Sequence, residues 1–403
     1  MQRLTQDERK LIEPIERSAM LERTERWSAI NSGTGNLTGL QRQAEELAHA
    51  FAALPGEVEL RAPAQVTSVD ASGREIEQAN GQHLILRVRP AAQRRFLLTG
   101  HMDTVYPADH PFQAGRWIDG DTYNAPGAAD MKGGIAVMLA ALVAFERSSA
   151  AASTGYDVMI NSDEETGSLS SAALIAELAR GKTAALTYEP SARPDGTLAH
   201  SRGGSGNYSV TISGRAAHAG RNPQDGRNAI VAAGALAVAL KTMEHPDLAI
   251  NPARIDGGSA NNVVPDLAIL RFNIRPKTAE AALNFERDFS VLLQHIEAVH
   301  EVGTHVHGGI TRPPKPVDLE AQRLFDLVQR TGADLGQDFG WQPSGGVCDG
   351  NNIAACGVPV VDTMGVRGGA IHSPEEYLIA SSLAERAALS AVVLHRLATG
   401  DLA

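Results

Sequence analysis

The chain has 403 residues, of which 43% are hydrophobic and 21% are charged, and its formal net charge at pH 7 is −11. At roughly 100–200 residues per domain, this length predicts two or three globular domains with a large apolar core. The negative charge argues against nucleic acid or an anionic membrane as a partner, because both bind basic surfaces. Anionic substrates remain compatible with it, since bound metal ions can reverse the local field.

Two cysteines, Cys348 and Cys356, are too few for a disulfide framework and lack the spacing of a CxxC metal site. The N-terminal residues 1–8 are polar, and no apolar stretch approaches ~18 uninterrupted residues. We therefore expect neither a signal peptide nor a membrane span, and we expect a cytoplasmic protein. The Met at position 1 argues against a leader that has been trimmed away.

The first half of the chain alternates between helical and strand-like patterns. Helices are expected at 5–30, 38–54, 133–146 and 170–179. Strands are expected at 84–88, 96–99, 157–161 and 184–188. This alternation predicts a mostly parallel sheet that is flanked by helices on both faces.

The pattern changes near residue 200 and again after a proline-rich segment at 311–316. Between these points it reads as strand, helix, strands, helix, strand, with segments at 208–212, 228–243, 267–275, 279–295 and 301–307. This is the order of a ferredoxin-like α+β domain. We therefore predict an α/β domain formed by residues 1–200 and 314–403, into which a smaller domain of residues 201–313 is inserted.

The pair His101 and Asp103 follows the strand expected at 96–99, at the sheet edge where open α/β sheets bind ligands. Residues i and i+2 of an extended chain share a face. His101 could therefore bind a metal ion while Asp103 accepts the other ring N–H. Taken alone, such a pair is usually an ordinary surface feature.

Other polar residues lie at comparable positions, and each alone has an ordinary explanation. Asp130 could be a helix cap, Glu164 and Glu165 a solvated turn, and His372 a structural residue, while Glu189 is uninformative. Together, two imidazoles and three carboxylates suit a pair of borderline metal ions such as Zn²⁺. A bridging Asp130 would hold two metals roughly 3.5–4 Å apart and leave Glu164 free to act as a base.

Four segments carry a resemblance to a known family: HMDTV at 101–105, GAADMKGG at 127–134, DEETGS at 163–168 and YEP at 188–190. They resemble the dizinc aminoacylase/carboxypeptidase G family, which includes glutamate carboxypeptidases, acetylornithine deacetylases and succinyl-diaminopimelate desuccinylases. The resemblance runs from about Ser32 to Tyr377, with the motifs in the family's order. It implies a dizinc exopeptidase-like catalytic domain with an inserted dimerisation domain.

The resemblance also implies roles for single residues. It makes Asp130 the bridging ligand, Asp103 a residue that supports the ligands and Glu164 the general base. It implies terminal metal ligands at His101, Glu165, Glu189 and His372. It further implies a non-proline cis bond after Asp130 and two Zn²⁺ ions per chain, or Co²⁺ or Mn²⁺ in their place.

The inserted domain extends the resemblance. His218 lies in GRAAHAG at 214–220, which resembles the segment whose histidine reaches the neighbouring subunit's site and binds the carbonyl oxygen of the substrate. A homodimer is therefore implied. The resemblance also implies substrate contacts at Asn262, Arg275, Arg312 and Arg202.

One segment departs from the carboxypeptidase G pattern. GGVCD at 345–349 includes the expected substrate contact Gly346, but Val347 and Cys348 stand where that branch has glycine and threonine. The metal ligands are unaffected, and the identity of the substrate is put in doubt. We expect Cys348 to be a buried, unreactive thiol.

We therefore expect a metal-dependent hydrolase that cleaves the amide bond of a C-terminal amino acid or an N-acyl amino acid with a free carboxylate. An N-acyl amino acid deacylase, which recognises the other side of the amide, is the main alternative. Glu189 disfavours an aminopeptidase, whose branch favours Asp there, while Arg312 and SGTGN at 32–36 favour the carboxypeptidase G branch. A non-catalytic binding protein of this fold would be expected to lack some of the metal ligands, and all five are present. The pair His305 and His307 has the His-x-His pattern of metal sites in barrel amidohydrolases, but no eight-fold β/α pattern surrounds it, so we do not expect a metal site there.

Overall fold

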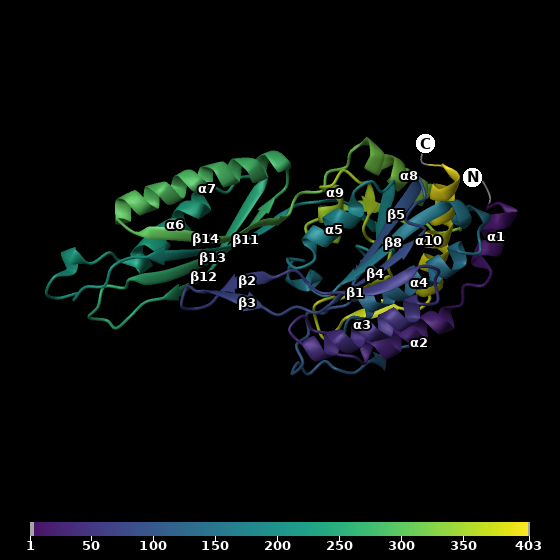
Figure 1. Cartoon of the computed structure of the whole chain (residues 1–403), viewed down its shortest axis with the longest axis horizontal. Coiled ribbons are helices and arrows are strands. Elements are labelled where there is room, and N and C mark those ends of the chain that lie inside the picture. The colour runs from purple at the N-terminus through teal and green to yellow at the C-terminus, as the bar shows by residue number, and fades with distance from the viewer. Residues whose placement is uncertain (1–3, 402–403) are drawn as a thin grey trace. The chain divides into compact units, whose positions relative to one another are not determined.

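The computed structural model describes residues 4–401, which form two compact units (Figure 1). The larger unit comprises residues 4–64, 79–201 and 317–401, and the smaller unit comprises Gln65–Gln78 and Arg202–Pro316. Residues 1–3, on which part of the expectation about the N-terminal segment rests, lie outside the described residues.

The larger unit is built on a six-stranded sheet with the order β1-β4-β8-β5-β9-β16. Its strands are β1 (Glu57–Arg61), β4 (His83–Val88), β5 (Arg94–His101), β8 (Thr154–Asn161), β9 (Ala184–Thr187) and β16 (Val360–Val361). The strands from β8 to β16 run parallel, and β4 is antiparallel to both of its neighbours. Every residue of β8 and β9 is buried, as expected for parallel strands covered on both faces. The predicted mostly parallel sheet is confirmed.

Helices cover both faces of this sheet. They are α1 (Gln6–Ile12), α2 (Arg17–Ser28), α3 (Leu37–Phe51), α4 (Gly133–Phe145), α5 (Ala172–Ala179), α8 (Leu319–Asp334), α9 (Asp349–Ala354) and α10 (Ser382–Thr399). Leu98 of β5 belongs to a core shared with α3, α4, α8 and α10, whereas the adjacent Leu97 belongs to a core shared with α5 and α9. Successive strand residues point to opposite faces, so one strand contributes to both cores.

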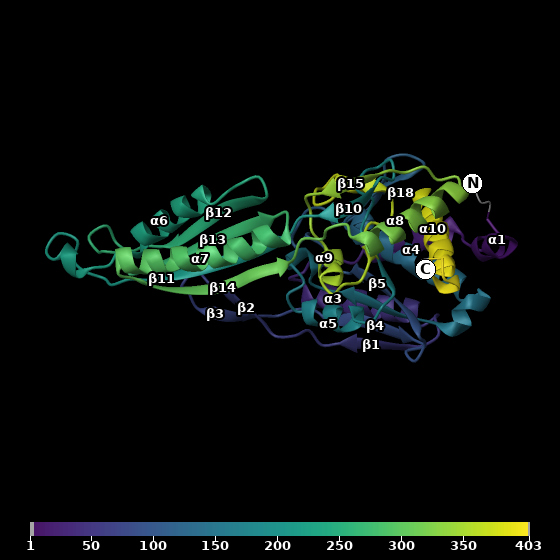
Figure 2. The same ribbon diagram turned by 90° about the horizontal axis from the view of Figure 1, so that it is seen from above.

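Two features of these helices differ from simple sequence expectations. The single helix expected at 5–30 is two helices, because Pro14 lacks an amide hydrogen and its ring clashes with the preceding turn. The stretch Ala128–Phe145, which packs along α10 (Figure 2), is long and apolar enough to cross a membrane by length and composition. However, 89% of it is buried inside the protein, so it occupies the position of a core helix.

Two small sheets complete the larger unit. One has the order β17-β18-β7-β6, with β6 (Arg116–Trp117), β7 (Thr122–Asn124), β17 (Gly368–Gly369) and β18 (Tyr377–Ile379). The other pairs β10 (Leu198–Arg202) with β15 (Trp341–Ser344). Because β18 pairs with β7, the loop before Tyr377 lies beside the segment that follows Asn124.

The smaller unit has the predicted ferredoxin-like order. Its elements are β11 (Ser205–Ser213), α6 (Ala229–Thr242), β12 (Leu248–Gly257), β13 (Leu267–Pro276), α7 (Ala279–His300) and β14 (Gly303–Arg312). The four strands form an antiparallel sheet with the order β12-β13-β11-β14. Both helices lie on one face of this sheet (Figure 1), where they share a core with Val210, Leu270 and Phe272.

A hairpin from the first half of the chain also belongs to the smaller unit, which the sequence analysis did not foresee. It consists of β2 (Val66–Val69) and β3 (Glu75–Gln78). His305 Nε2 lies 2.9 Å from a Glu75 oxygen, and His307 Nε2 lies 3.0 Å from the Thr67 hydroxyl. The predicted boundaries placed these residues with the larger domain. The strands have four residues each, with β2 only partly buried and β3 exposed, and such strands carry no apolar periodicity that would indicate their packing partner.

Candidate metal centre

Three of the predicted ligands come from the carboxyl ends of neighbouring parallel strands. His101 is the last residue of β5, Glu165 lies in the short helix η3 (Glu164–Thr166) after β8, and Glu189 follows β9. These three strands are adjacent in the sheet and run in the same direction. Their ends therefore meet at one edge, the usual ligand-binding edge of an open α/β sheet.

The other two predicted ligands come from irregular segments. Asp130 lies in the segment η1 (Ala128–Lys132), and the peptide bond from Asp130 to Met131 is cis, as the family resemblance implied. His372 lies in the loop between β17 and β18 with a φ of 62°, in the left-handed region that residues with a Cβ rarely adopt. Left-handed residues that carry a Cβ are often found at functional sites.

Asp130 connects the five side chains into two sets. Its Oδ1 lies 3.0 Å from His101 Nε2, which is also 3.8 Å from a carboxylate oxygen of Glu189. Its Oδ2 lies 3.2 Å from His372 Nε2, which is also 3.2 Å from a carboxylate oxygen of Glu165. Each set thus contains one imidazole and one glutamate, and Asp130 gives one oxygen to each.

The charges of this cluster fit bound cations. Burial, together with the charge of Asp130, raises the pKa of Glu165 to about 7 and that of Glu189 to about 8. Hydrogen bonds to Asp130 and Glu165 raise the pKa of His372 to about 11. Buried carboxylates require compensating positive charge. Imidazole nitrogens and carboxylate oxygens are ligands that zinc and similar divalent ions accept, so these residues fit a pair of such ions.

Asp103 supports the turn after β8 as well as His101. Its side chain is fully buried, and its carboxylate accepts the main-chain amides of Glu164 and Glu165 at 3.2 and 3.1 Å. His101 Nδ1 lies 3.0 Å from the Asp103 carbonyl oxygen and 3.4 Å from its carboxylate. The expected partner of the ring N–H was the carboxylate, but the carbonyl is nearer because the carboxylate is directed to the amides of the turn.

Glu164 lies next to the ligand cluster and is half-buried. A carboxylate oxygen of Glu164 and ligand atoms of His101 and Glu189 all lie within 4.8 Å of one another. His101, Asp130 and Glu165 form a second such group. An acidic side chain at this position could accept a proton near a metal-bound substrate or could itself bind a metal.

The remaining predicted site residues are distributed over both units. In the smaller unit, His218 is exposed and pairs with Val263, which brings it beside Asn262. Arg275 is exposed on the polar face of β13, whereas Arg202 and Arg312 are buried. In the larger unit, Gly346 is exposed between β15 and α9, and nearby Cys348 is buried, as expected.

Glu376 and Tyr106 were missed in the sequence analysis. The Glu376 carboxylate is buried and accepts hydrogen bonds from three main-chain amides and from the Tyr106 hydroxyl. Burial raises its pKa to about 7. Its position four residues after His372 was the available signal, but a glutamate in a loop has no periodicity that would single it out.

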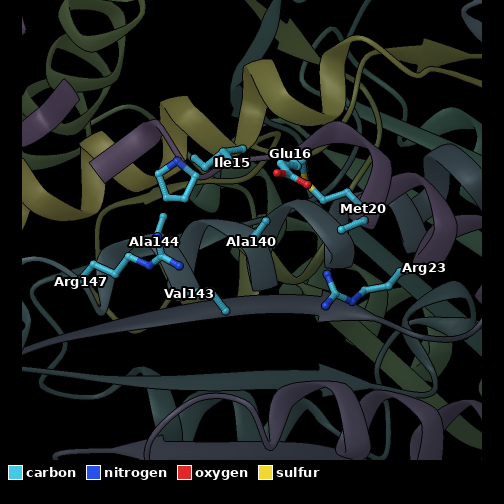
Figure 3. Close-up of a pocket in the computed structure, with 10 residues that line it drawn as sticks. Ile15, Glu16, Met20, Arg23, Ala140, Val143, Ala144 and Arg147 are labelled. Atoms are coloured by element: carbon cyan, nitrogen blue, oxygen red, sulfur yellow. The ribbon is translucent and has the colours of Figure 1, made fainter. Parts of the chain in front are cut away.

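A separate cavity of about 200 Å³ lies between α2, α4 and the segment Pro14–Glu16 that precedes α2 (Figure 3). Arg147 and Arg23 lie at opposite ends of it, with Ala140 of α4 between them. None of the predicted site residues lines this cavity. This cavity is therefore not part of the cluster around Asp130.

Comparisons with known proteins identify the family of this chain. The family model described as Peptidase family M20/M25/M40 matches residues 97–396. Carboxypeptidase G2 of Pseudomonas sp. (strain RS-16) is 28% identical over 398 residues, which cover 96% of this chain and 91% of that protein. A succinyl-diaminopimelate desuccinylase of Psychrobacter sp. (strain PRwf-1) is 28% identical over 295 residues, which cover 68% of this chain and 71% of that protein.

The fold is shared with solved structures of the same family. A dinuclear metal binding peptidase of the M20 family from Bacillus subtilis superposes with a TM-score of 0.64 at 15% identity, over 94% of this chain and 98% of that chain. The family model covers well over half of the chain, and the structure brings the expected metal-ligating side chains together. The chain therefore belongs to peptidase family M20/M25/M40 and is a metal-dependent hydrolase that acts on amide bonds.

Proposed function

We propose that this protein hydrolyses the amide bond that precedes a C-terminal amino acid, or that joins an acyl group to an amino acid, in small substrates with a free carboxylate. We further propose that it does so with two Zn²⁺ ions per chain, or Co²⁺ or Mn²⁺ in their place. The observation that carries the proposal is the sharing of Asp130 between the sets of His101 and His372. The similarity to carboxypeptidase G2 over 96% of the chain supports this substrate class.

The chain's own residues would divide the work of hydrolysis. Two bound divalent cations would lower the pKa of water toward ~7 and polarise the scissile carbonyl. Glu164, beside His101 and Glu189, would accept the proton of the attacking water and then donate it to the leaving nitrogen. Asp103 would hold Glu164 in place, because its carboxylate accepts a hydrogen bond from the main-chain amide of Glu164.

The proposed substrate contacts come from residues of both units. Arg275 is exposed and its guanidinium group suits a substrate carboxylate. Asn262 lies beside His218, which would donate to the carbonyl oxygen as negative charge develops there. Arg312 and Arg202 are buried, so a contact with substrate would require their side chains to be uncovered. Exposed Gly346 is the proposed substrate contact in the larger unit.

We propose that His218 acts in the site of a second copy of the chain, so that the active form is a homodimer. Large aliphatic side chains are exposed on the two helices of the smaller unit, including Val238 of α6 at 68% and Leu283 of α7 at 67%. Exposed apolar side chains on one face favour a protein partner. Sedimentation of the wild type and of Val238→Glu with Leu283→Glu would test this, with a dimer expected for the first and a monomer for the second.

The enzymatic proposal is tested with metal-loaded protein and a matched substrate panel. Each peptidyl or N-acyl amino acid is paired with the same compound in which the terminal carboxylate is an amide. We expect hydrolysis of the carboxylates and strongly reduced kcat/KM for the amides. Absence of hydrolysis across the panel, in protein shown to hold its metals, would contradict the proposal.

The same panel separates the main alternative, an N-acyl amino acid deacylase, for which the similarity to a desuccinylase is the supporting observation. One series varies the amino acid at a constant acyl group, and a second varies the acyl group at a constant amino acid. A carboxypeptidase-type enzyme is expected to discriminate mainly in the first series. Discrimination mainly in the second would favour the deacylase. A non-catalytic role is disfavoured because the five ligand candidates and Glu164 all converge.

A further inference from the structure

Glu376 lies in the loop between β17 and β18, four residues after His372, and only 1% of it is exposed. Its Oε1 accepts the main-chain amides of Ala129 and Asp130, both at 3.0 Å. Its Oε2 accepts the main-chain amide of Gly127 at 3.1 Å. One buried carboxylate therefore receives three amides of the short segment that carries Asp130.

The same carboxylate reaches the segment that follows His101. The Tyr106 hydroxyl lies 2.8 Å from Glu376 Oε2 and also 2.8 Å from the carbonyl oxygen of Ser373. Tyr106 is five residues from His101, and Ser373 is adjacent to His372. Glu376 and Tyr106 thus connect the segments of three metal-ligand candidates that are far apart in the sequence.

This arrangement is specific to the ligand segments. All four of these donors to Glu376 belong to segments that carry ligand candidates. The nearby buried ammonium of Lys132 donates instead to the carbonyl oxygens of Trp27 and Ile30. Hydrogen bonds to an ionised group are stronger and more directional than those between neutral groups, so a carboxylate can hold amides in a defined place.

We infer that Glu376 is a positioning residue, which holds the Asp130 segment so that the two oxygens of Asp130 face His101 and His372 at the same time. Tyr106 is its second anchor. The inference rests on the proposed two-metal function and adds to it a residue that binds neither metal nor substrate. A bridging ligand must satisfy two metals at once, so a small displacement of its backbone impairs both sites.

Two variants test the inference. Glu376→Gln keeps the side-chain volume and one acceptor oxygen but presents an NH₂ group where Oε2 accepts Gly127 and Tyr106. Tyr106→Phe removes only the hydroxyl anchor and keeps the three amide contacts. Residues that orient metal ligands typically contribute 10–100-fold to metal affinity or activity. Zn²⁺ affinity is measured by competition with a chromogenic chelator. We expect Glu376→Gln to bind Zn²⁺ about 10–100-fold more weakly than the wild type, and Tyr106→Phe to show a smaller loss of affinity.

The kinetic expectation is that kcat at saturating metal falls in both variants while KM stays unchanged, because the reacting geometry is altered and substrate binding is not. Glu8→Gln is the matched control. Glu8 is a similarly buried glutamate on α1 that accepts from Arg396 of α10, and neither helix carries a ligand candidate. We expect this control to lower the unfolding temperature while metal affinity and kcat stay at wild-type values.

The outcomes separate this inference from the proposed function. Wild-type protein that binds only background metal would overturn both. Wild-type protein with two metals, together with Glu376→Gln and Tyr106→Phe that behave like the Glu8→Gln control, would overturn the inference alone. If Glu376→Gln does not fold, the milder Tyr106→Phe decides, because unchanged metal affinity and kcat in that variant would show that the anchor does not position Asp130.

Discussion

The main-chain amide of Glu164 donates a hydrogen bond to the buried carboxylate of Asp103 over 3.2 Å. The next amide of the turn, that of Glu165, donates to the other oxygen over 3.1 Å. The proposed base and a proposed ligand are thus held by one side chain, which the sequence analysis connected only with His101. The Thr34 hydroxyl, at 2.8 Å, is a third donor to Asp103.

Asp103→Asn should therefore impair the base more than the fold. The new NH₂ group cannot accept an amide, so one of the two contacts to the turn is lost while the shape is kept. We expect kcat to fall about 10–100-fold, the range for residues that orient metal-site groups. Thr34→Val, which removes only the hydroxyl donor, should lower kcat by a smaller factor. Wild-type kcat in Asp103→Asn would show that the turn does not depend on this carboxylate.

Glu164→Ala should retain the metals and lose activity, because a base is removed while the five proposed ligands remain. General acid–base catalysis typically contributes about 10²–10⁴-fold to the rate. Elemental analysis and kcat are measured on the same preparation, with Glu165→Ala as the matched variant that should lose metal. Loss of metal from Glu164→Ala would instead make Glu164 a ligand, a role that its group with His101 and Glu189 also permits.

Metal affinity should rise with pH. In the metal-free protein, burial raises the pKa of Glu165 to about 7 and that of Glu189 to about 8, from an ordinary value of 4.5. Both groups must lose their protons before they bind a cation, and so must the imidazolium of His372, whose pKa is raised to about 11 by its hydrogen bonds to Asp130 and Glu165. Binding therefore releases protons, and the metal affinity falls progressively as the pH is lowered. Chelator competition at several pH values and calorimetry in buffers of different ionisation enthalpy would measure this. A pH-independent affinity would contradict the assignment of these glutamates as ligands.

The same shifts predict how pH affects the stability of the metal-free protein. A carboxyl group whose pKa is raised on folding binds more protons in the folded state than in the unfolded state. Its contribution to stability is therefore lost as the pH rises from 4.5 through 7 and 8. We expect the free energy of unfolding of the metal-free protein to fall over this interval, and added metal to reverse the fall. Thermal melts with and without chelator would check both signs.

His218→Ala should lower kcat with metal content and folding unchanged. An exposed residue with no role usually changes stability by less than ~0.5 kcal/mol when it is substituted. Loss of one donor to a developing oxyanion typically costs about 10²–10³-fold in kcat. Measured kcat, metal content and unfolding temperature of the variant distinguish the two cases. A wild-type kcat would make His218 an ordinary surface residue.

Mixing two inactive variants tests whether His218 acts across the dimer. Heterodimers of Glu164→Ala and His218→Ala chains would contain one site that combines an intact Glu164 with an intact His218. Activity should return on subunit exchange and approach about a quarter of the wild-type value for random dimers. If exchange is demonstrated and activity stays absent, His218 acts within its own chain or has no catalytic role.

The local sequence pattern was sufficient to predict the regular strands and helices that carry the candidate metal site. The alternation of strands and helices predicted the mostly parallel sheet, and the position of His101 at a strand end predicted its place at the sheet edge. The sequence pattern did not predict where short strands pack when their partners are far away in the sequence. The hairpin of β2 and β3 joins the smaller unit through contacts such as that of Glu75 with His305, 230 residues along the chain.

From the sequence alone, it was possible to predict which residues could bind metal and that His101, Glu165 and Glu189 follow strands, because side-chain chemistry and period are local properties. The folded chain alone shows that Asp130 gives one oxygen to His101 and the other to His372. It also shows that Glu376 receives the Asp130 amide, 246 residues away. The physical reason is that an amide in an irregular segment takes whichever acceptor the packed chain brings within about 3 Å, and no local pattern encodes that choice.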